Sequence, residues 1–266
     1  MLPDTAPLLN GRPDTVPFPR IIAHRGARKV APENTLAAFR IAAQQGALGA
    51  EFDVSLLGDG TPVLHHDATL DRCSDRTGPL AEIGQADIAG IDCGSWFSSN
   101  FAGEPLATLD QGLDLLHDLE FVSNLEMKPH GAAKVMARAV AAALGHRPEA
   151  RAEILISSFD LNALAAFRAL MPEQPIAVLY DNPPEDWPEA LADLAASSLH
   201  VWRENMSEDL VRAAARAGVH LRVYTVNDPA EMVTYRDHPA GELGGIITDH
   251  PPAFLDDPDW VRWAQG

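Results

Sequence analysis

The chain has 266 residues, 46% of them hydrophobic and 22% charged, which excludes a disordered chain and predicts one large globular domain. Its 38 acidic residues outnumber its 20 basic residues and give a net charge of −18, a field that argues against nucleic-acid and anionic-membrane partners. The two cysteines, Cys73 and Cys93, are too few for a disulfide framework or a four-thiolate zinc site.

Residues 1–19 are interpreted as a proline-rich leader, and residues 20–266 as the folded domain. The leader lacks the basic and apolar regions of a signal peptide, and no run in the chain approaches the ~20 apolar residues of a membrane-spanning helix. We therefore expect a cytoplasmic protein with no integral membrane segment. An anionic substrate would need local cations, because the overall field opposes it.

From residue 20 onward, short apolar segments typical of strands alternate with alanine-rich segments of helical period. Eight strands are predicted, over residues 20–24, 50–56, 121–128, 154–159, 175–180, 198–202, 220–226 and 245–248. Helices are predicted between and after them, over residues 34–45, 109–119, 132–144, 161–170, 185–196, 208–217, 229–236 and 252–264. Eight such units in about 250 residues predict an α/β fold of the TIM (β/α)8 barrel type. A doubly wound sheet is the alternative, but it usually carries a glycine-rich nucleotide-binding motif, and none is present.

Residues 67–108 interrupt this alternation. The segment has no clear amphipathic helix, contains several glycines and includes Trp96, Phe97 and Phe101. Because a structureless loop of this length is uncommon in a compact domain, we interpret it as a small inserted subdomain after the second strand, lying over the barrel mouth. A long surface loop is the alternative. The three aromatic residues would form the core of the insertion, or else contact substrate.

Three acidic residues are predicted to converge at the carboxyl end of the barrel, where TIM barrels carry their active sites. Glu51 and Asp53 are two apart on the second strand and so face the same side, and Glu126 arrives from the next strand, two residues before Lys128. Three carboxylates at one point offer oxygen ligands to a divalent cation, Mg²⁺ or Ca²⁺ rather than Zn²⁺. The alternative is a buried salt bridge from Glu51 or Glu126 to Lys128.

Two histidines are predicted on the same rim. His24 ends the first strand and precedes Arg25, and His66 follows a short apolar run. Two histidines beside a metal can act as general acid and general base, although a lone histidine is more often structural. Arg25 and Lys128 would supply charge-assisted hydrogen bonds to an oxyanion. This set suits displacement at a phosphodiester, whose poor alkoxide leaving group needs protonation.

Eight short motifs follow one another along the chain. The first four are His-Arg-Gly at 24–26, Ala-Pro-Glu-Asn-Thr at 31–35, Glu-Phe-Asp at 51–53 and His-Asp-Ala-Thr-Leu-Asp-Arg at 66–72. The later four are Leu-Glu-Met-Lys at 125–128, Ser-Ser-Phe-Asp at 157–160, Val-Tyr-Thr-Val-Asn at 223–227 and Gly-Ile-Ile-Thr-Asp at 245–249. Their order over residues 20–252 resembles the glycerophosphodiester phosphodiesterase family, and such a combination is highly specific.

The resemblance implies a TIM barrel with a small insertion that hydrolyses glycerophosphodiesters to sn-glycerol 3-phosphate and an alcohol, with a divalent cation, Mg²⁺ or Ca²⁺. It also implies roles for seven residues: the general acid/base pair His24 and His66, the metal ligands Glu51, Asp53 and Glu126, and the phosphate contacts Arg25 and Lys128. A lysophospholipase D-type enzyme acting on lipid substrates and a non-catalytic phosphate-binding barrel are the alternatives.

Two residues of the second motif are expected to support the site. Asn34 would cap the following helix, and Glu33 would position Arg25 or a metal ligand. The chain departs from the family pattern at Tyr224, where tryptophan is often expected, and at Ala107, where proline is usual.

Overall fold

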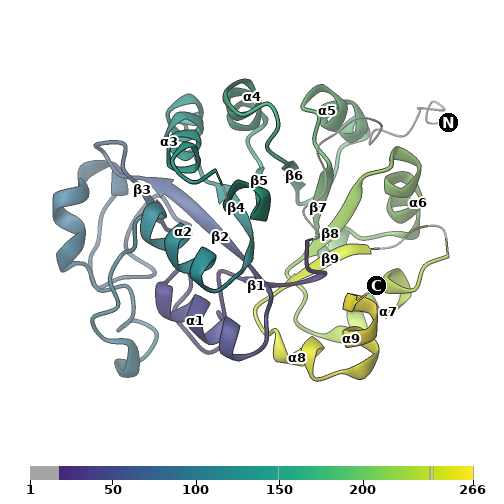
Figure 1. The fold of residues 1–266 in the computed structure, drawn as a ribbon, viewed down its shortest axis with the longest axis horizontal. Coiled ribbons are helices and arrows are strands. Elements are labelled where there is room, and N and C mark those ends of the chain that lie inside the picture. The colour runs from purple at the N-terminus through teal and green to yellow at the C-terminus, as the bar shows by residue number, and fades with distance from the viewer. Residues whose placement is uncertain (1–17, 149, 240, 242, 266) are drawn as a thin grey trace.

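The structure is a computed structural model, which describes residues 18–148, 150–239, 241 and 243–265. Nearly all of the predicted leader, residues 1–17, lies outside the described residues. The predicted TIM barrel is confirmed (Figure 1). Its eight parallel strands are β1 (Ile21–His24), β2 (Gly49–Leu56), β4 (Val122–Met127), β5 (Ile154–Ser158), β6 (Ile176–Tyr180), β7 (Ser198–Trp202), β8 (His220–Tyr224) and β9 (Leu243–Thr248). The barrel closes because β1 pairs in parallel with both β2 and β9.

Helices follow the strands and cover the outside of the barrel (Figure 1). They are α1 (Leu36–Gln44), α2 (Leu109–Asp118), α3 (Ala133–Gly145), α4 (Leu161–Leu170), α5 (Trp187–Asp193), α6 (Glu208–Ala217), α7 (Val233–Arg236), α8 (Pro252–Leu255) and α9 (Pro258–Gln265). The single helix predicted over 252–264 is wrong, because it is divided into α8 and α9. Pro258 begins α9, and a proline fits the first turn of a helix but not its interior. Within the described part of the chain, no helix is long and apolar enough to cross a bilayer.

Strand β2 illustrates why the polar site lies inside the barrel while the core lies outside it. Phe52 and Val54 are fully buried in the main hydrophobic cluster between strands and helices, and the Phe52 ring meets the Phe39 ring of α1 edge to face at 5.8 Å. Side chains alternate along a strand, so Glu51 and Asp53 face the opposite way, into the barrel.

The segment after β2 has its own arrangement. A strand that the sequence did not predict, β3 (Pro62–Leu64), pairs antiparallel with β2. Short 3-10 helices follow at Leu80–Glu82, Gln85–Gly90 and Ser99–Phe101. A second hydrophobic cluster gathers seven side chains, those of Leu57, Val63, Leu70, Leu80, Ile91, Cys93 and Leu106. In Figure 1 this segment lies at the left of the barrel, on the side opposite α8 and α9.

Trp96, Phe97 and Phe101 contact one another within this segment. Their rings meet edge to face at 5.7 Å for Trp96 and Phe97 and at 5.8 Å for Phe97 and Phe101.

Candidate active site

Three carboxylates meet inside the barrel near the carboxyl ends of β2 and β4. Glu51 and Asp53 lie on β2, and the pairing of Asp53 with Glu126 on β4 brings the third acid beside them. One oxygen of each residue lies within 4.8 Å of the other two. All three side chains are buried, with Asp53 fully so. The alternation of β2 and its parallel pairing with β4 therefore produce the predicted cluster.

The electrostatics of this cluster fit a hard divalent cation. Burial raises the pKa of Glu51 well above its usual range and that of Glu126 to about 7. Burial would also raise the pKa of Asp53, but Arg25 and Lys128 lower it to about 2. Among the described residues, Oε1 of Glu51 has no hydrogen-bond partner, and Oδ1 of Asp53 and Oε1 of Glu126 have only Lys128 within ion-pair distance. Such crowded, under-satisfied oxygens are the ligands that Mg²⁺ and Ca²⁺ prefer.

Arg25 and Lys128 lie against the same acids. Nε of Arg25 is 2.9 Å from Oδ2 of Asp53, and its backbone N–H donates to Oε2 of Glu51 at 3.1 Å. Nζ of Lys128 is 2.5 Å from Oε1 of Glu126 and 3.5 Å from Oδ1 of Asp53. The alternative salt bridge between Glu126 and Lys128 is therefore present, together with the carboxylate cluster rather than in place of it.

Each of the two predicted histidines is paired with a carboxylate through Nδ1. The distance is 2.6 Å from His24 to Oδ1 of Asp249 and 2.6 Å from His66 to Oδ1 of Asp67. An ionised carboxylate only accepts hydrogen bonds, so Nδ1 carries the proton and Nε2 is left for chemistry. Nε2 of His24 lies 3.8 Å from Oε2 of Glu51. Burial lowers the pKa of both histidines although the carboxylates oppose it, which favours neutral rings able to accept a proton at Nε2.

The expected helix cap at Asn34 is wrong by one residue. Thr35 caps α1, its Oγ1 accepting from the backbone N–H of Ala38 at 3.2 Å. Asn34 has a φ of 57°, unlike the extended backbone of an N-cap residue, and its amide binds Asp53 instead. It donates to Oδ2 of Asp53 at 2.8 Å and accepts from the backbone N–H of Asp53 at 3.0 Å. Asn34 thus supports a carboxylate of the cluster.

The predicted contact of Glu33 with Arg25 is present, with Nη1 donating to Oε1 at 2.7 Å. Sequence reasoning assigned no role to Asp249, Asp67 or Arg72, although all three occur in the quoted motifs. The available signal was position: Asp249 directly follows β9, and Asp67 directly follows His66.

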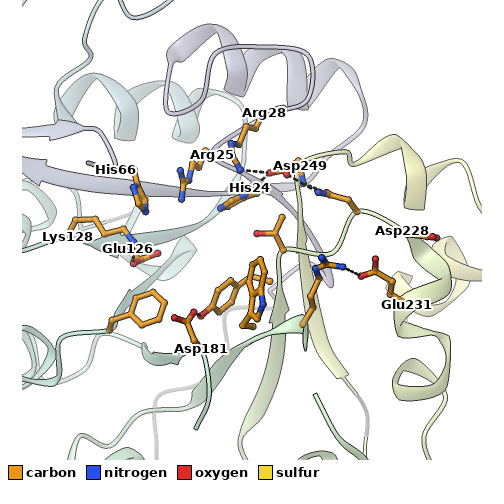
Figure 2. A pocket seen from close by; sticks show the side chains of 16 residues that line it. His24, Arg25, Arg28, His66, Glu126, Lys128, Asp181, Asp228, Glu231 and Asp249 are labelled. Carbon is orange, nitrogen blue, oxygen red and sulfur yellow. Dashed lines mark hydrogen bonds and ion pairs between the residues drawn. The ribbon is translucent and has the colours of Figure 1, made fainter. Parts of the chain in front are cut away.

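A pocket of about 660 Å³ lies at the carboxyl ends of the strands. Of the seven predicted site residues, five line it, namely His24, Arg25, His66, Glu126 and Lys128. Glu51 and Asp53 are buried behind that lining. In Figure 2, His24, Arg25 and His66 extend along one side of the pocket, and Asp181 lies across from them.

An aromatic wall, made of Phe159, Trp202 and Tyr224, completes the pocket. The Tyr224 ring lies 6.1 Å from that of Phe159 and 5.8 Å from that of Trp202, and its hydroxyl donates to Oδ1 of Asp181 at 3.0 Å. The wall comes from the carboxyl ends of β5, β7 and β8. The pocket therefore combines charged side chains with an aromatic wall.

Comparison with known proteins finds one family. The family model described as "Glycerophosphoryl diester phosphodiesterase family" matches residues 24–253. The chain is 35% identical to a glycerophosphodiester phosphodiesterase of Caldanaerobacter subterraneus subsp. tengcongensis, over 88% of this chain and 96% of the relative. It resembles the structure of an Oleispira antarctica phosphodiesterase in complex with the product sn-glycerol-3-phosphate, with a TM-score of 0.84 and 29% identity over 94% of this chain and 98% of the other. A glycerophosphodiester phosphodiesterase from Agrobacterium tumefaciens is similar at a TM-score of 0.76 and 29% identity, over 90% of this chain and 100% of the other.

Proposed function

This chain belongs to the glycerophosphoryl diester phosphodiesterase family, and on that premise we propose that it hydrolyses glycerophosphodiesters to sn-glycerol 3-phosphate and an alcohol. We propose that the reaction depends on a divalent cation and on two histidines. The observation that carries this proposal is that one pocket is lined by His24, His66, Arg25, Lys128 and Glu126. The other two acids of the carboxylate cluster are buried behind this lining, and each histidine is paired with a carboxylate.

Glu51, Asp53 and Glu126 would hold the cation, because one oxygen of each lies within 4.8 Å of the other two. Each also has one buried oxygen without a hydrogen bond in the described structure, and the ammonium of Lys128 lies near those of Asp53 and Glu126. A bound Mg²⁺ or Ca²⁺ supplies Lewis-acid stabilisation of the charge that builds up on the phosphoryl oxygens. Asn34 would keep the carboxylate of Asp53 oriented through its two hydrogen bonds.

Arg25 and Lys128 would bind the phosphate group of the substrate. Both line the pocket beside the carboxylates, and both can donate charge-assisted hydrogen bonds to phosphoryl oxygens. They bring positive charge to the pocket of a protein whose net charge is −18. Together with a cation on the three carboxylates, they would offset the repulsion between a phosphodiester anion and the global charge.

His24 and His66 would divide the proton transfers. Since the paired carboxylates keep the proton on Nδ1, the neutral form of either ring can take a proton at Nε2. One histidine would take a proton from the attacking water as its oxygen bonds to phosphorus. The other, protonated, would give a proton to the alcohol oxygen as the bond between that oxygen and phosphorus breaks. Placed general acids and bases of this kind contribute roughly 10²- to 10⁴-fold each to the rate.

The test is release of glycerol 3-phosphate from glycerophosphocholine by chelator-treated protein, with Mg²⁺, Ca²⁺ or no metal added back. Turnover restored by one of the cations is the expected result. Glu126→Gln should weaken the restoration, and circular dichroism would verify that both proteins are folded. Folded protein that is inactive with every cation would refute the proposal.

Release of choline from lysophosphatidylcholine, measured with the same cations and compared with release of choline from glycerophosphocholine, examines the lipid-acting alternative. The exposed Phe159 ring in the aromatic wall, 41% accessible, is the feature that favours it. A preference for the lipid, measured as kcat/KM, would change the substrate assignment. Binding of glycerol 3-phosphate without turnover of either compound would favour the non-catalytic barrel.

A further inference from the structure

We propose that Arg72 is a positioning residue, which orients His66 through Asp67. Through Glu33, Arg72 is also connected to the phosphate contact Arg25 and, by way of Arg28, to the pair of Asp249 and His24. The inference rests on the proposed function, in which His66 transfers a proton. It assigns to the segment after β3, which supplies Arg72, a direct part in organising the barrel's active site.

The guanidinium of Arg72 binds two carboxylates at once. Its Nη1 and Nη2 donate to Oε2 and Oε1 of Glu33 at 2.9 and 2.8 Å. Its Nε and Nη2 face Oδ2 and Oδ1 of Asp67 at 2.7 and 3.1 Å. Two edges of one planar group therefore hold two carboxylates in a defined relative orientation, which the single ammonium of a lysine could not do.

Asp67 transmits this orientation to His66. Its Oδ1 lies 2.6 Å from Nδ1 of the ring, so the plane of the carboxylate determines where Nε2 points. The His66 side chain is 32% accessible, and apart from Asp67 no hydrogen-bond partner of its ring is found among the described residues. A partly exposed ring without this restraint would occupy several rotamers.

Glu33 links the same arginine to the other side of the site. Its carboxylate, 3% accessible, also accepts from Nη1 of Arg25 at 2.7 Å and from Nε of Arg28 at 2.9 Å. Nη1 of Arg28 lies 3.4 Å from Oδ1 of Asp249, the oxygen that is paired with His24. Figure 2 shows Arg28 beside Asp249 and His24.

The contacts form one continuous network between the two histidines. In order, it runs through His66, Asp67, Arg72, Glu33, Arg28, Asp249 and His24. A network with this connectivity restrains the separation of the two proton-transferring rings. Displacements of about 1 Å at such groups can reduce turnover 10²-fold.

Arg72 can be tested because it is 42% accessible. Without Arg72, the buried carboxylate of Glu33 would still pair with Arg25 and Arg28, so removal of Arg72 should reduce kcat without unfolding the protein. A purely structural role would instead lower the melting temperature, and a role in substrate binding would raise KM.

The experiment compares Arg72→Ala and Arg72→Lys with a matched control, Arg76→Ala. Arg76 is four residues away and exposed, and its side chain contacts Asp75 at 3.9 Å and donates to the backbone oxygen of Gly90 at 3.1 Å, with no contact to Asp67 or Glu33 given by the described structure. For Arg72→Ala we expect kcat on glycerophosphocholine to fall about 10- to 100-fold, KM to change by less than about 3-fold, and guanidinium at tens of millimolar to restore part of the activity. Arg72→Lys should remain impaired, and Arg76→Ala should match the wild type with and without guanidinium.

Three results would overturn the proposal while the wild type remains active: kcat of Arg72→Ala close to the wild type, a loss that guanidinium does not restore, or an equal loss in Arg76→Ala. Inactivity of the wild type would instead refute the proposed function.

A second measurement then still tests the role of Arg72. Imidazole ¹⁵N shifts of His66 should report one Nδ1-protonated tautomer in the wild type and averaged tautomers in Arg72→Ala; identical spectra would refute the positioning role.

Discussion

Binding of Mg²⁺ or Ca²⁺ to the carboxylate cluster is expected to release protons and to weaken as the pH falls. Burial raises the pKa of Glu126 to about 7 and that of Glu51 well above its usual range, whereas Asp53, with a pKa of about 2, is ionised throughout. Metal ligands must be deprotonated. A cation that binds near neutral pH therefore displaces protons from Glu126 and Glu51.

The size of the effect follows from the pKa of Glu126. With a pKa of about 7, this carboxyl is about nine-tenths protonated at roughly pH 6 and about one-tenth protonated at roughly pH 8. Glu126 alone should thus release nearly one proton per cation at the lower pH and almost none at the higher. It should weaken the apparent affinity about tenfold between the two, and Glu51 should increase the effect.

Isothermal titration calorimetry in buffers of different ionisation enthalpy counts the released protons. Glu126→Gln should release about one proton fewer at roughly pH 6 and should bind the cation more weakly at roughly pH 8. Asp118→Asn, which alters an exposed acid on α2 outside the pocket, should behave as the wild type. Affinity that does not change with pH, or release of no protons at the lower pH, would refute the argument that burial keeps these acids protonated.

Three further predictions concern catalysis and stability. His66→Ala should reduce kcat roughly 10²- to 10⁴-fold and leave the calorimetric affinity for the cation unchanged; wild-type turnover would exclude the acid/base role. Gly26→Ala should lower the melting temperature more than Gly60→Ala. Both glycines have a positive φ, 82° and 88°, but only at Gly26 would an added Cβ come within 2.7–2.9 Å of Ala38. Equal shifts in melting temperature would contradict this. The free energy of unfolding of the metal-free protein, measured by chemical denaturation, should fall as the pH rises through about 7. The contribution of Glu126 to this fall is up to about 1.4 kcal/mol per pH unit, because its carboxyl binds a proton in the folded state that the unfolded state has already lost. A stability that rises over the same range would have the wrong sign.

The sequence alone determined the barrel and the direction in which its strand side chains point. Alternating apolar strands and helical segments predicted all eight barrel strands, with ends that differ from the observed ones by at most two residues. The spacing of Glu51 and Asp53 placed both on one face, since side chains on a strand alternate. These features depend on residues close together in the chain, where period and propensity act directly.

Boundaries and local caps were less well predicted. Thr35, and not Asn34, caps α1 because the backbone of Asn34 turns its amide toward Asp53. The short strand β3 was missed, since three residues carry too little pattern to be recognised and their pairing with β2 stabilises them. Both outcomes come from contacts with another strand.

Only the tertiary structure determined which charged groups meet across the barrel. Asp249 reaches His24 because β1 pairs with β9 in a register that places Ala23 opposite Thr248, 225 residues apart in the chain. Likewise Arg72 meets Glu33 only when the segment after β3 folds back onto the loop between β1 and α1. Residue spacing specifies the face of a strand, but barrel closure and loop packing specify the partner, and hence the ion network that holds the two histidines.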